Sequence, residues 1–342
     1  MKYSEAIRDA LSQSLKRDER VFLMGLGVTD AKGVFGSTTG LQEEFGSQRV
    51  FDIPVCENTI VGIMNGASMQ GMRPIMVNQR IDFILYAMDQ IINHSAKWKW
   101  MFGGAQKLPI VIRAIVGRGW GQGPQHSQSM HALFAHIPGL KVVAPVTPYD
   151  AKGLLIASLE DDDPVIFIEH RRLYDIEGDV PDGLYSVPIG KAAILREGSD
   201  ITLVASSQMV LVAQRAGVEL AKVNISAEII DLRTLRPLDE DTVLQSVQKT
   251  GHLIVIDSDW KACGIAGEIL AIVAEHCPFA LKSPAIRLTW PDIPTPTSIA
   301  LEDLFYTKAT DIYKNVFISL GHPLKEDNLQ IEKIDQPFEG PF

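Results

Sequence analysis

Short strand-like runs alternate with helix-like segments along the first half of the chain, and this alternation restricts the fold more than any other feature. Apolar runs occur at residues 21–25, 50–55, 73–78, 108–116, 140–145 and 164–170. Helical patterns lie between them at 58–72, 83–102, 128–136 and 149–159. Short strands joined through helices form a mainly parallel sheet that is covered on both faces. The sequence therefore predicts an α/β domain.

A second, smaller α/β unit follows a break in this pattern. Between residues 173 and 188 Gly, Pro, Asp and Tyr dominate, which is typical of a linker. Strand patterns then recur at 201–205, 226–231 and 252–257, with helical patterns at 208–223, 239–250 and 264–276. At 342 residues the chain exceeds the size at which one core stops growing. We expect domains at 1–180 and 181–325, and an extended tail at 326–342.

The composition favours small molecules and other proteins as partners. A formal net charge of -10 argues against a nucleic-acid surface, which normally carries a basic patch. Every apolar run is shorter than the roughly 18 residues that a membrane span needs. The three cysteines show neither CxxC nor metal-ligand spacing, and a helical pattern starts at the N-terminus without a signal peptide. We expect a soluble cytoplasmic protein with reduced thiols.

The segment Gln125-His126-Ser127-Gln128-Ser129 follows a strand-like run and a loop of alternating glycines at 117–123. A histidine there can donate and accept protons, whereas a loop histidine bonded to backbone is the structural alternative. The loop lacks GxGxxG spacing, so it is not a dinucleotide fingerprint. We interpret it as an active-site loop.

Glu57 lies where the strand-like run at 50–55 gives way to a helix rich in small residues. Ligands of open α/β folds bind at the carboxyl edge of the sheet, which makes Glu57 a candidate functional acid. A carboxylate in the first turn that interacts with the helix dipole is the alternative. The residues alone leave both interpretations open.

Together, the Glu57 segment and the His126 loop resemble the beta subunit of the thiamine diphosphate-dependent decarboxylating component of 2-oxo acid dehydrogenase complexes, of the pyruvate dehydrogenase type. The resemblance extends from Tyr3 to about His322. Residues 229–239, Ile-Ile-Asp-Leu-Arg-Thr-Leu-Arg-Pro-Leu-Asp, also resemble the transketolase C-terminal signature. The resemblance implies a pyrimidine-binding parallel-sheet domain followed by a transketolase C-terminal-like domain.

The resemblance also implies roles for individual residues. It implies that Glu57 hydrogen-bonds the ring nitrogen of the thiamine aminopyrimidine and that His126 lies near the thiazolium. Phe83 matches by position the aromatic residue that packs on the aminopyrimidine, with an ordinary core role as the alternative. We assign Gln79 to the same cofactor pocket.

A structural potassium site is a further implication of the resemblance. In the family, main-chain oxygens near an acidic turn at a helix end bind this ion. The corresponding positions here are Ile110, Ser158, Leu159, Asp161 and Asp163. A solvated run of charges is the alternative.

A missing motif indicates a partner. Thiamine diphosphate also needs a Gly-Asp-Gly motif and an asparagine about 25 to 30 residues later, which hold magnesium and the diphosphate. The sequence contains no such pair. The resemblance therefore implies a separate alpha subunit that holds the magnesium, a heterotetramer of two alpha and two beta chains, and a lipoyl acyltransferase component as an acyl acceptor.

The sequence departs from the family pattern after the first strand, after the third strand and in the active-site loop, which carries Arg118, Trp120 and Gln122. Gly25-Leu26-Gly27 replaces the acids that usually follow the first strand, and Gln79-Arg80-Ile81-Asp82 replaces the usual apolar and threonine residues. Arginines suit carboxylates or phosphates, so we assign Arg80 and Arg118 to the substrate.

Two alternatives to a 2-oxo acid dehydrogenase stay open. One is a subunit of a split transketolase-like enzyme that moves a two-carbon unit between sugars or other acceptors. The other is a noncatalytic scaffold paralogue, which would need neither Glu57 nor His126.

Overall fold

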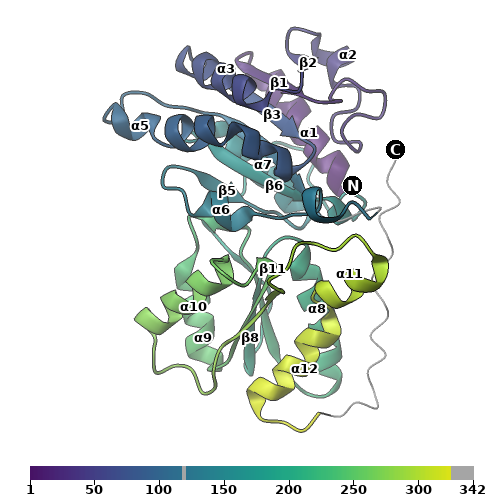
Figure 1. Ribbon diagram of the computed structural model, residues 1–342, viewed down its shortest axis with the longest axis vertical. Coiled ribbons are helices and arrows are strands. Elements are labelled where there is room, and N and C mark those ends of the chain that lie inside the picture. The colour runs from purple at the N-terminus through teal and green to yellow at the C-terminus, as the bar shows by residue number, and fades with distance from the viewer. Residues whose placement is uncertain (118–120, 325–342) are drawn as a thin grey trace. The chain divides into compact units, whose positions relative to one another are not determined.

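The computed structural model describes residues 1–117 and 121–324, which form two compact units. The first unit holds residues 1–117 and 128–189, and the second holds 121–127 and 190–324 (Figure 1). Arg118 and the tail predicted at 326–342 lie outside the described residues. In the described ranges, no helix is both long enough and apolar enough to span a bilayer.

A parallel sheet forms the centre of the first unit, as predicted. The strands of this unit lie in the order β5-β6-β4-β3-β1-β2, and these six are parallel to one another. Their bounds are β1 Val21–Gly25, β2 Val50–Asp52, β3 Arg73–Asn78, β4 Val111–Val116, β5 Lys141–Val143 and β6 Val165–His170. Because the carboxyl ends of parallel strands meet at one edge, the loops that follow these strands gather there.

Helices and short helical turns connect these strands. They are α1 Tyr3–Arg17, α2 Leu41–Phe45, α3 Glu57–Met69, α4 Ile81–Ile84, η1 Leu85–Ala87, η2 Gln90–Ser95, α5 Trp98–Met101, η3 Gly123–Gln125, α6 His131–Ala135, α7 Pro148–Glu160 and η4 Arg171–Leu173. Helix α1 packs along α7, and α3 packs on η1 and η2. The turn η3 belongs to the second unit.

The single helix predicted at 83–102 is wrong, because the segment divides into α4, η1, the π-helical η2 and α5. Side chains compete for the backbone there: the Ser95 hydroxyl donates to the Gln90 carbonyl at 3.0 Å, and Asn65 Nδ2 donates to the same oxygen at 3.4 Å. When side chains donate to a main-chain oxygen of a helix in this way, they compete with the regular main-chain hydrogen bonds, and the helical turn widens. The helix predicted at 128–136 is also shorter, since Met130 has a left-handed φ of 49°.

A buried ion pair joins β4 to β6 in the core of this sheet. Arg113 and Glu169 are both fully buried, and Arg113 Nε and Nη2 donate to the two Glu169 carboxylate oxygens at 2.5 and 2.7 Å. The Tyr174 hydroxyl donates to Glu169 Oε2 at 2.5 Å, and Ser37 Oγ accepts from Arg113 at 2.8 Å. These bonds pair two opposite charges, each of which would be costly to bury alone.

The second unit contains a smaller sheet in the order β12-β11-β8-β9-β7, in which only β7 runs antiparallel to its neighbour. Its elements are β7 Ala193–Arg196, β8 Ile201–Ala205, α8 Gln208–Lys222, β9 Ala227–Asp231, β10 Thr234–Arg236, α9 Glu240–Thr250, β11 Leu253–Trp260, α10 Ile265–His276, β12 Ile286–Trp290, α11 Ile299–Phe305 and α12 Ala309–Leu320. The predicted strands and helices between 201 and 276 are present. The sequence pattern did not predict β7, β10, β12, α11 or α12.

Candidate active site

Glu57 is the first residue of α3, directly after the loop that leaves β2. The buried positions of α3 recur at helical spacing and form one stripe that begins with Glu57 and continues through Ile60, Val61, Met64, Asn65 and Ser68. The carboxylate therefore faces inward, and Glu57 is only 7% exposed. Within the described residues, neither a hydrogen bond nor an ion pair reaches it. A buried acid in this state is suited to a ligand or a partner chain.

The loops after β1, β2 and β3 are tied together at the carboxyl edge. Gln79 Nε2 donates to the Leu26 carbonyl at 2.8 Å. Asp52 accepts from the Val28 N–H at 2.9 Å and from the Thr29 hydroxyl at 2.9 Å. Gln79, predicted to contact the cofactor, thus uses its amide nitrogen to hold the β1 loop and keeps its amide oxygen as an acceptor.

Two buried guanidinium groups follow strands that flank β4. Arg80 follows β3 and is 8% exposed, while Arg171 follows β6 and is 1% exposed. Burial and the charge of Arg80 lower the pKa of Arg171 to about 10. Burial also lowers the pKa of Arg80. The adjacent Asp82 accepts a 2.7 Å hydrogen bond from Gln128 Nε2, and burial raises its pKa. This edge of the sheet is therefore rich in positive charge.

Arg171 is a candidate that the sequence analysis missed. The signal was present, because an arginine pair follows the strand predicted at 164–170, as Arg80 follows the strand at 73–78. Arg171 was not selected, because Glu57 and His126, which follow other strands, carried stronger signals. Phe83 lies near Arg80, half-buried in α4.

His126 belongs to the second unit, whereas Glu57 belongs to the first. It is half-buried and follows η3, and its N–H donates to the Gly123 carbonyl at 3.4 Å. Gly123 has a φ of 61°, and a Cβ atom at this position would collide with the Thr297 hydroxyl. Glycine therefore allows the loop to lie closer to Thr297 than any other residue would. The predicted substrate residue Arg118 lies outside the described residues.

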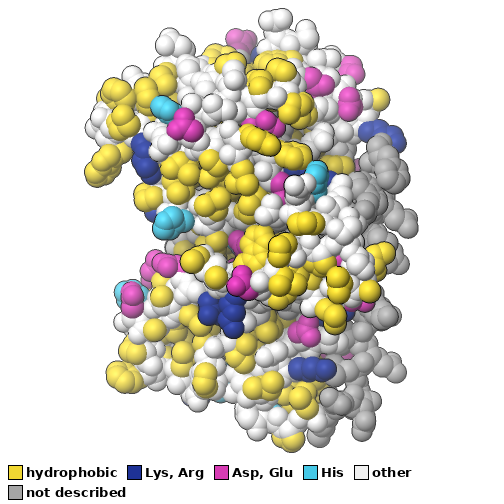
Figure 2. Space-filling view, in the orientation of Figure 1, with side chains coloured by type: hydrophobic (Ala, Val, Ile, Leu, Met, Phe, Trp, Pro, Cys, Tyr) yellow, Lys and Arg dark blue, Asp and Glu magenta, His cyan; other side chains and the backbone are white. Residues whose placement is uncertain are grey.

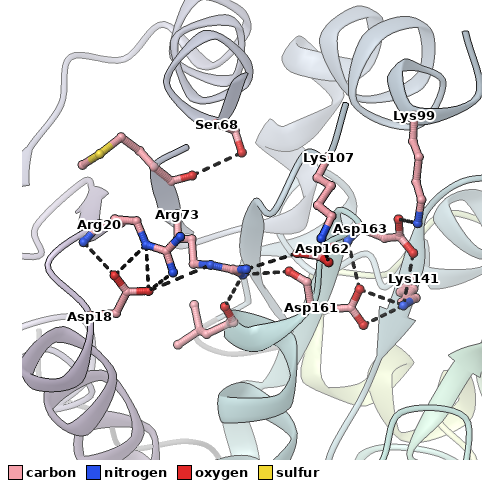
Figure 3. Close-up of polar contacts among 12 residues, drawn as sticks. Asp18, Arg20, Ser68, Arg73, Lys99, Lys107, Lys141, Asp161, Asp162 and Asp163 are labelled. Carbon is pink, nitrogen blue, oxygen red and sulfur yellow. Dashed lines mark hydrogen bonds and ion pairs between the residues drawn. The ribbon is translucent and has the colours of Figure 1, made fainter. Parts of the chain in front are cut away.

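At three of the five positions predicted to bind potassium, the main-chain oxygen accepts a hydrogen bond from the protein, and Arg73 supplies two of these bonds (Figure 3). Arg73 Nη1 donates to the Leu159 carbonyl at 2.8 Å and to the Asp161 carbonyl at 2.9 Å. The Ile110 carbonyl accepts from Val165 at 3.0 Å. Among the described residues, no cluster of three or more His, Cys, Asp or Glu side chains is suited to a metal ion.

Comparison with known families matches both units. Residues 1–177 match the family model of the transketolase pyrimidine-binding domain, and residues 190–312 match that of the transketolase C-terminal domain. A solved structure described as a split gene transketolase, inactive beta4 tetramer, has a TM-score of 0.77 and 19% identity, and the match covers 94% of this chain and 98% of that one. The fold and the sheet edge thus define a two-domain protein of the transketolase type.

Curated relatives identify the family within this class of transketolase-type proteins. The beta subunit of acetoin:2,6-dichlorophenolindophenol oxidoreductase from Cupriavidus necator is 46% identical, with 90% of this chain and 94% of the relative covered. The beta subunit of 2-oxoisovalerate dehydrogenase from Bacillus subtilis is also 46% identical, with 89% and 94% covered. The pyruvate dehydrogenase E1 beta subunit from Rickettsia felis is 40% identical, with 91% and 96% covered. The chain belongs to this family of dehydrogenase E1 beta subunits.

Proposed function

We propose that this chain supplies the pyrimidine half of a thiamine diphosphate site in a split enzyme that oxidatively decarboxylates a 2-oxo acid. The observation that supports this most is the 7% exposed, unpartnered carboxyl of Glu57 at the start of α3, inside the region that matches the pyrimidine-binding domain. The chemistry that thiamine diphosphate supplies when bound is a nucleophilic carbon next to a positive nitrogen, which can accept the electron pair of a breaking carbon-carbon bond.

The residues of this chain would prepare that chemistry. Glu57 would hold a proton at the ring nitrogen of the aminopyrimidine, and its burial would keep water from that hydrogen bond. Phe83 would pack against the pyrimidine ring, and Gln79 would keep the β1 loop in place beside it. His126 would move protons at the reacting carbon, because an imidazole can donate and accept near neutral pH.

Arg80 and Arg171 support a substrate that carries a negative charge. A buried guanidinium binds a carboxylate through two parallel hydrogen bonds and loses little of that energy to water. A 2-oxo acid carries such a carboxylate, whereas acetoin, named in the relative from C. necator, is neutral. We therefore favour the 2-oxo acid, and we propose Arg118 as a third contact.

We propose that an alpha subunit completes the enzyme as a heterotetramer of two alpha and two beta chains. The alpha subunit would hold the magnesium and the diphosphate, since this sequence lacks the motif for them. Apolar side chains gather on the surface at α5, where Trp100, Met101 and Phe102 are 88%, 62% and 46% exposed (Figure 2). Such a patch suits a surface that a partner covers.

The expected acyl acceptor is a lipoyl domain of an acyltransferase component. We also propose a cytoplasmic location, because the exposed Cys263 is a free thiol, which a reducing compartment preserves.

The test is to coexpress the chain with a candidate alpha subunit and assay the complex with thiamine diphosphate and magnesium. We expect turnover of one or more 2-oxo acids with an artificial electron acceptor. Parallel assays use acetoin and a panel of ketose phosphates. Turnover of ketose phosphates alone would support the split transketolase, turnover of acetoin alone would exclude the acid substrate, and no turnover by a cofactor-loaded complex would favour the scaffold.

A further inference from the structure

The C-terminus of α7 concentrates negative charge. The last carbonyl oxygens of a helix lack partners within it and form the negative end of the helix dipole. Here Asp161, Asp162 and Asp163 follow the helix directly. A turn of this kind needs nearby positive charge if it is to hold one conformation.

Four basic side chains from different segments supply that charge (Figure 3). Lys141 Nζ contacts Asp161 at 2.6 Å and Asp163 at 3.2 Å, Lys99 contacts Asp163 at 2.5 Å, and Lys107 contacts Asp162 at 2.5 Å. The Lys107 and Arg73 charges lower the pKa of Asp162. Burial opposes ionisation of Asp163, but Lys99 and Lys141 still lower its pKa.

Arg73, the fourth of these, is the one that reaches the main chain. Its side chain is 15% exposed and begins at the first residue of β3. Its Nη1 donates to the carbonyl oxygens of Leu159 and Asp161 at 2.8 and 2.9 Å, and its Nη2 contacts Asp162 Oδ1 at 3.2 Å. One planar cation therefore gathers two main-chain oxygens and one carboxylate oxygen around the helix end.

We propose that the guanidinium of Arg73 takes the place of the potassium ion that the family resemblance implies, so that this turn keeps its conformation without a bound metal cation. Leu159 and Asp161, whose carbonyl oxygens Arg73 holds, are two of the five positions expected to bind potassium. An ion placed on the same oxygens would lie close to the guanidinium, which would repel it. The nearby lysines already neutralise the carboxylates that would otherwise attract it. This inference does not depend on the proposed reaction.

The experiment measures thermal unfolding of the full-length chain in KCl, NaCl and choline chloride at equal ionic strength. We expect the wild-type Tm to be the same in the three salts. Arg73→Gln should lower the Tm by about 4 °C or more in choline chloride, because it removes charge-assisted hydrogen bonds. KCl should then raise the Tm of this variant more than NaCl does, since the released oxygens can bind the larger ion.

Arg20→Gln is the matched control. Arg20 pairs with Asp18 beside the cluster, is 59% exposed, and donates to neither the Leu159 nor the Asp161 carbonyl. Its variant should be as insensitive to potassium as the wild type. Specific stabilisation of the wild type by KCl would overturn the proposal, and so would an Arg73→Gln variant that KCl does not rescue. If Arg73→Gln does not fold, the wild-type comparison still decides, and Arg73→Lys replaces it.

Discussion

Replacing Glu57 with glutamine should remove most of the turnover of the assembled enzyme while changing its stability little. Glutamine keeps the shape of the side chain but cannot hold the acid proton. Turnover should therefore fall more than tenfold, which corresponds to at least about 1.4 kcal/mol of barrier. The reduced step should be proton loss from the cofactor's thiazolium carbon.

The position of Glu57 gives its carboxylate two opposing effects on stability. A carboxylate in the first turn of a helix gains about 0.3 to 1 kcal/mol from the dipole, which glutamine loses. Burial of the unpartnered carboxylate has the opposite sign, and glutamine relieves it. Because the two effects oppose each other, we expect the free energy of unfolding to change by no more than about 1 kcal/mol.

Two measurements check this prediction. Deuterium exchange at the thiazolium carbon of the loaded complex reports cofactor activation, and urea unfolding of the isolated chain reports stability. Glu268→Gln is a matched control, because Glu268 lies in the first turn of α10 but is exposed. The Glu268→Gln substitution should leave both deuterium exchange and turnover unchanged. If Glu57→Gln kept exchange within tenfold of wild type, Glu57 would not be the activating acid.

Two further predictions concern charge. Arg171→Gln should raise the KM for a 2-oxo acid more than tenfold with a smaller change in kcat, and should leave any turnover of acetoin unaffected; equal effects on both substrates in steady-state assays would point to a structural role. In the second unit, burial and the Lys282 charge lower the pKa of half-buried His252 below its ordinary value near 6.5. As pH falls through about 6.5 the unfolded chain therefore takes up the proton first, and stability decreases. His252→Gln should flatten urea-unfolding stability between about pH 7 and pH 5, and an unchanged slope would contradict this assignment.

The sequence predicted those parts of the fold in which the hydrophobic pattern and the final structure agree. The strands of the first sheet are short apolar runs that become buried, and α7 and α8 follow the periodic segments predicted for them. Segment 83–102 failed because its local pattern is helical, while Asn65 from α3 and the Ser95 hydroxyl widen the ladder at Gln90. A contact from a distant helix is not visible in a local pattern.

In the candidate site, too, some features could be predicted from the sequence and others could not. The position of Glu57 at the start of a helix was predictable, because the sequence shows a strand-like run followed directly by a helical segment, whereas its catalytic role stays a prediction. The occupation of the Leu159 and Asp161 carbonyls by Arg73 was not, since those residues are far apart in the chain and no pattern links them. The roles assigned to Phe83 and His126 stay predictions.

The departures from the family pattern after the first and third strands are physically coupled. The loop Gly25-Leu26-Gly27 lacks the usual acids, and the neighbouring segment carries Gln79 and Arg80. Gln79 Nε2 donates to the Leu26 carbonyl at 2.8 Å, and a Cβ atom on Gly27 would lie 3.0 Å from the same nitrogen. An acidic side chain at position 27 would therefore displace the amide that holds the loop. Gly27 also has a left-handed φ of 70°, which disfavours other residues.

Restoring one acid alone should break the contact between Gln79 and Leu26. We therefore interpret the missing acids and the new polar residues as one change in the carboxyl edge of the sheet. Its effect is to place the positive charge of Arg80 after β3 at an edge where the β1 loop carries no acid, which suits the anionic substrate that we propose.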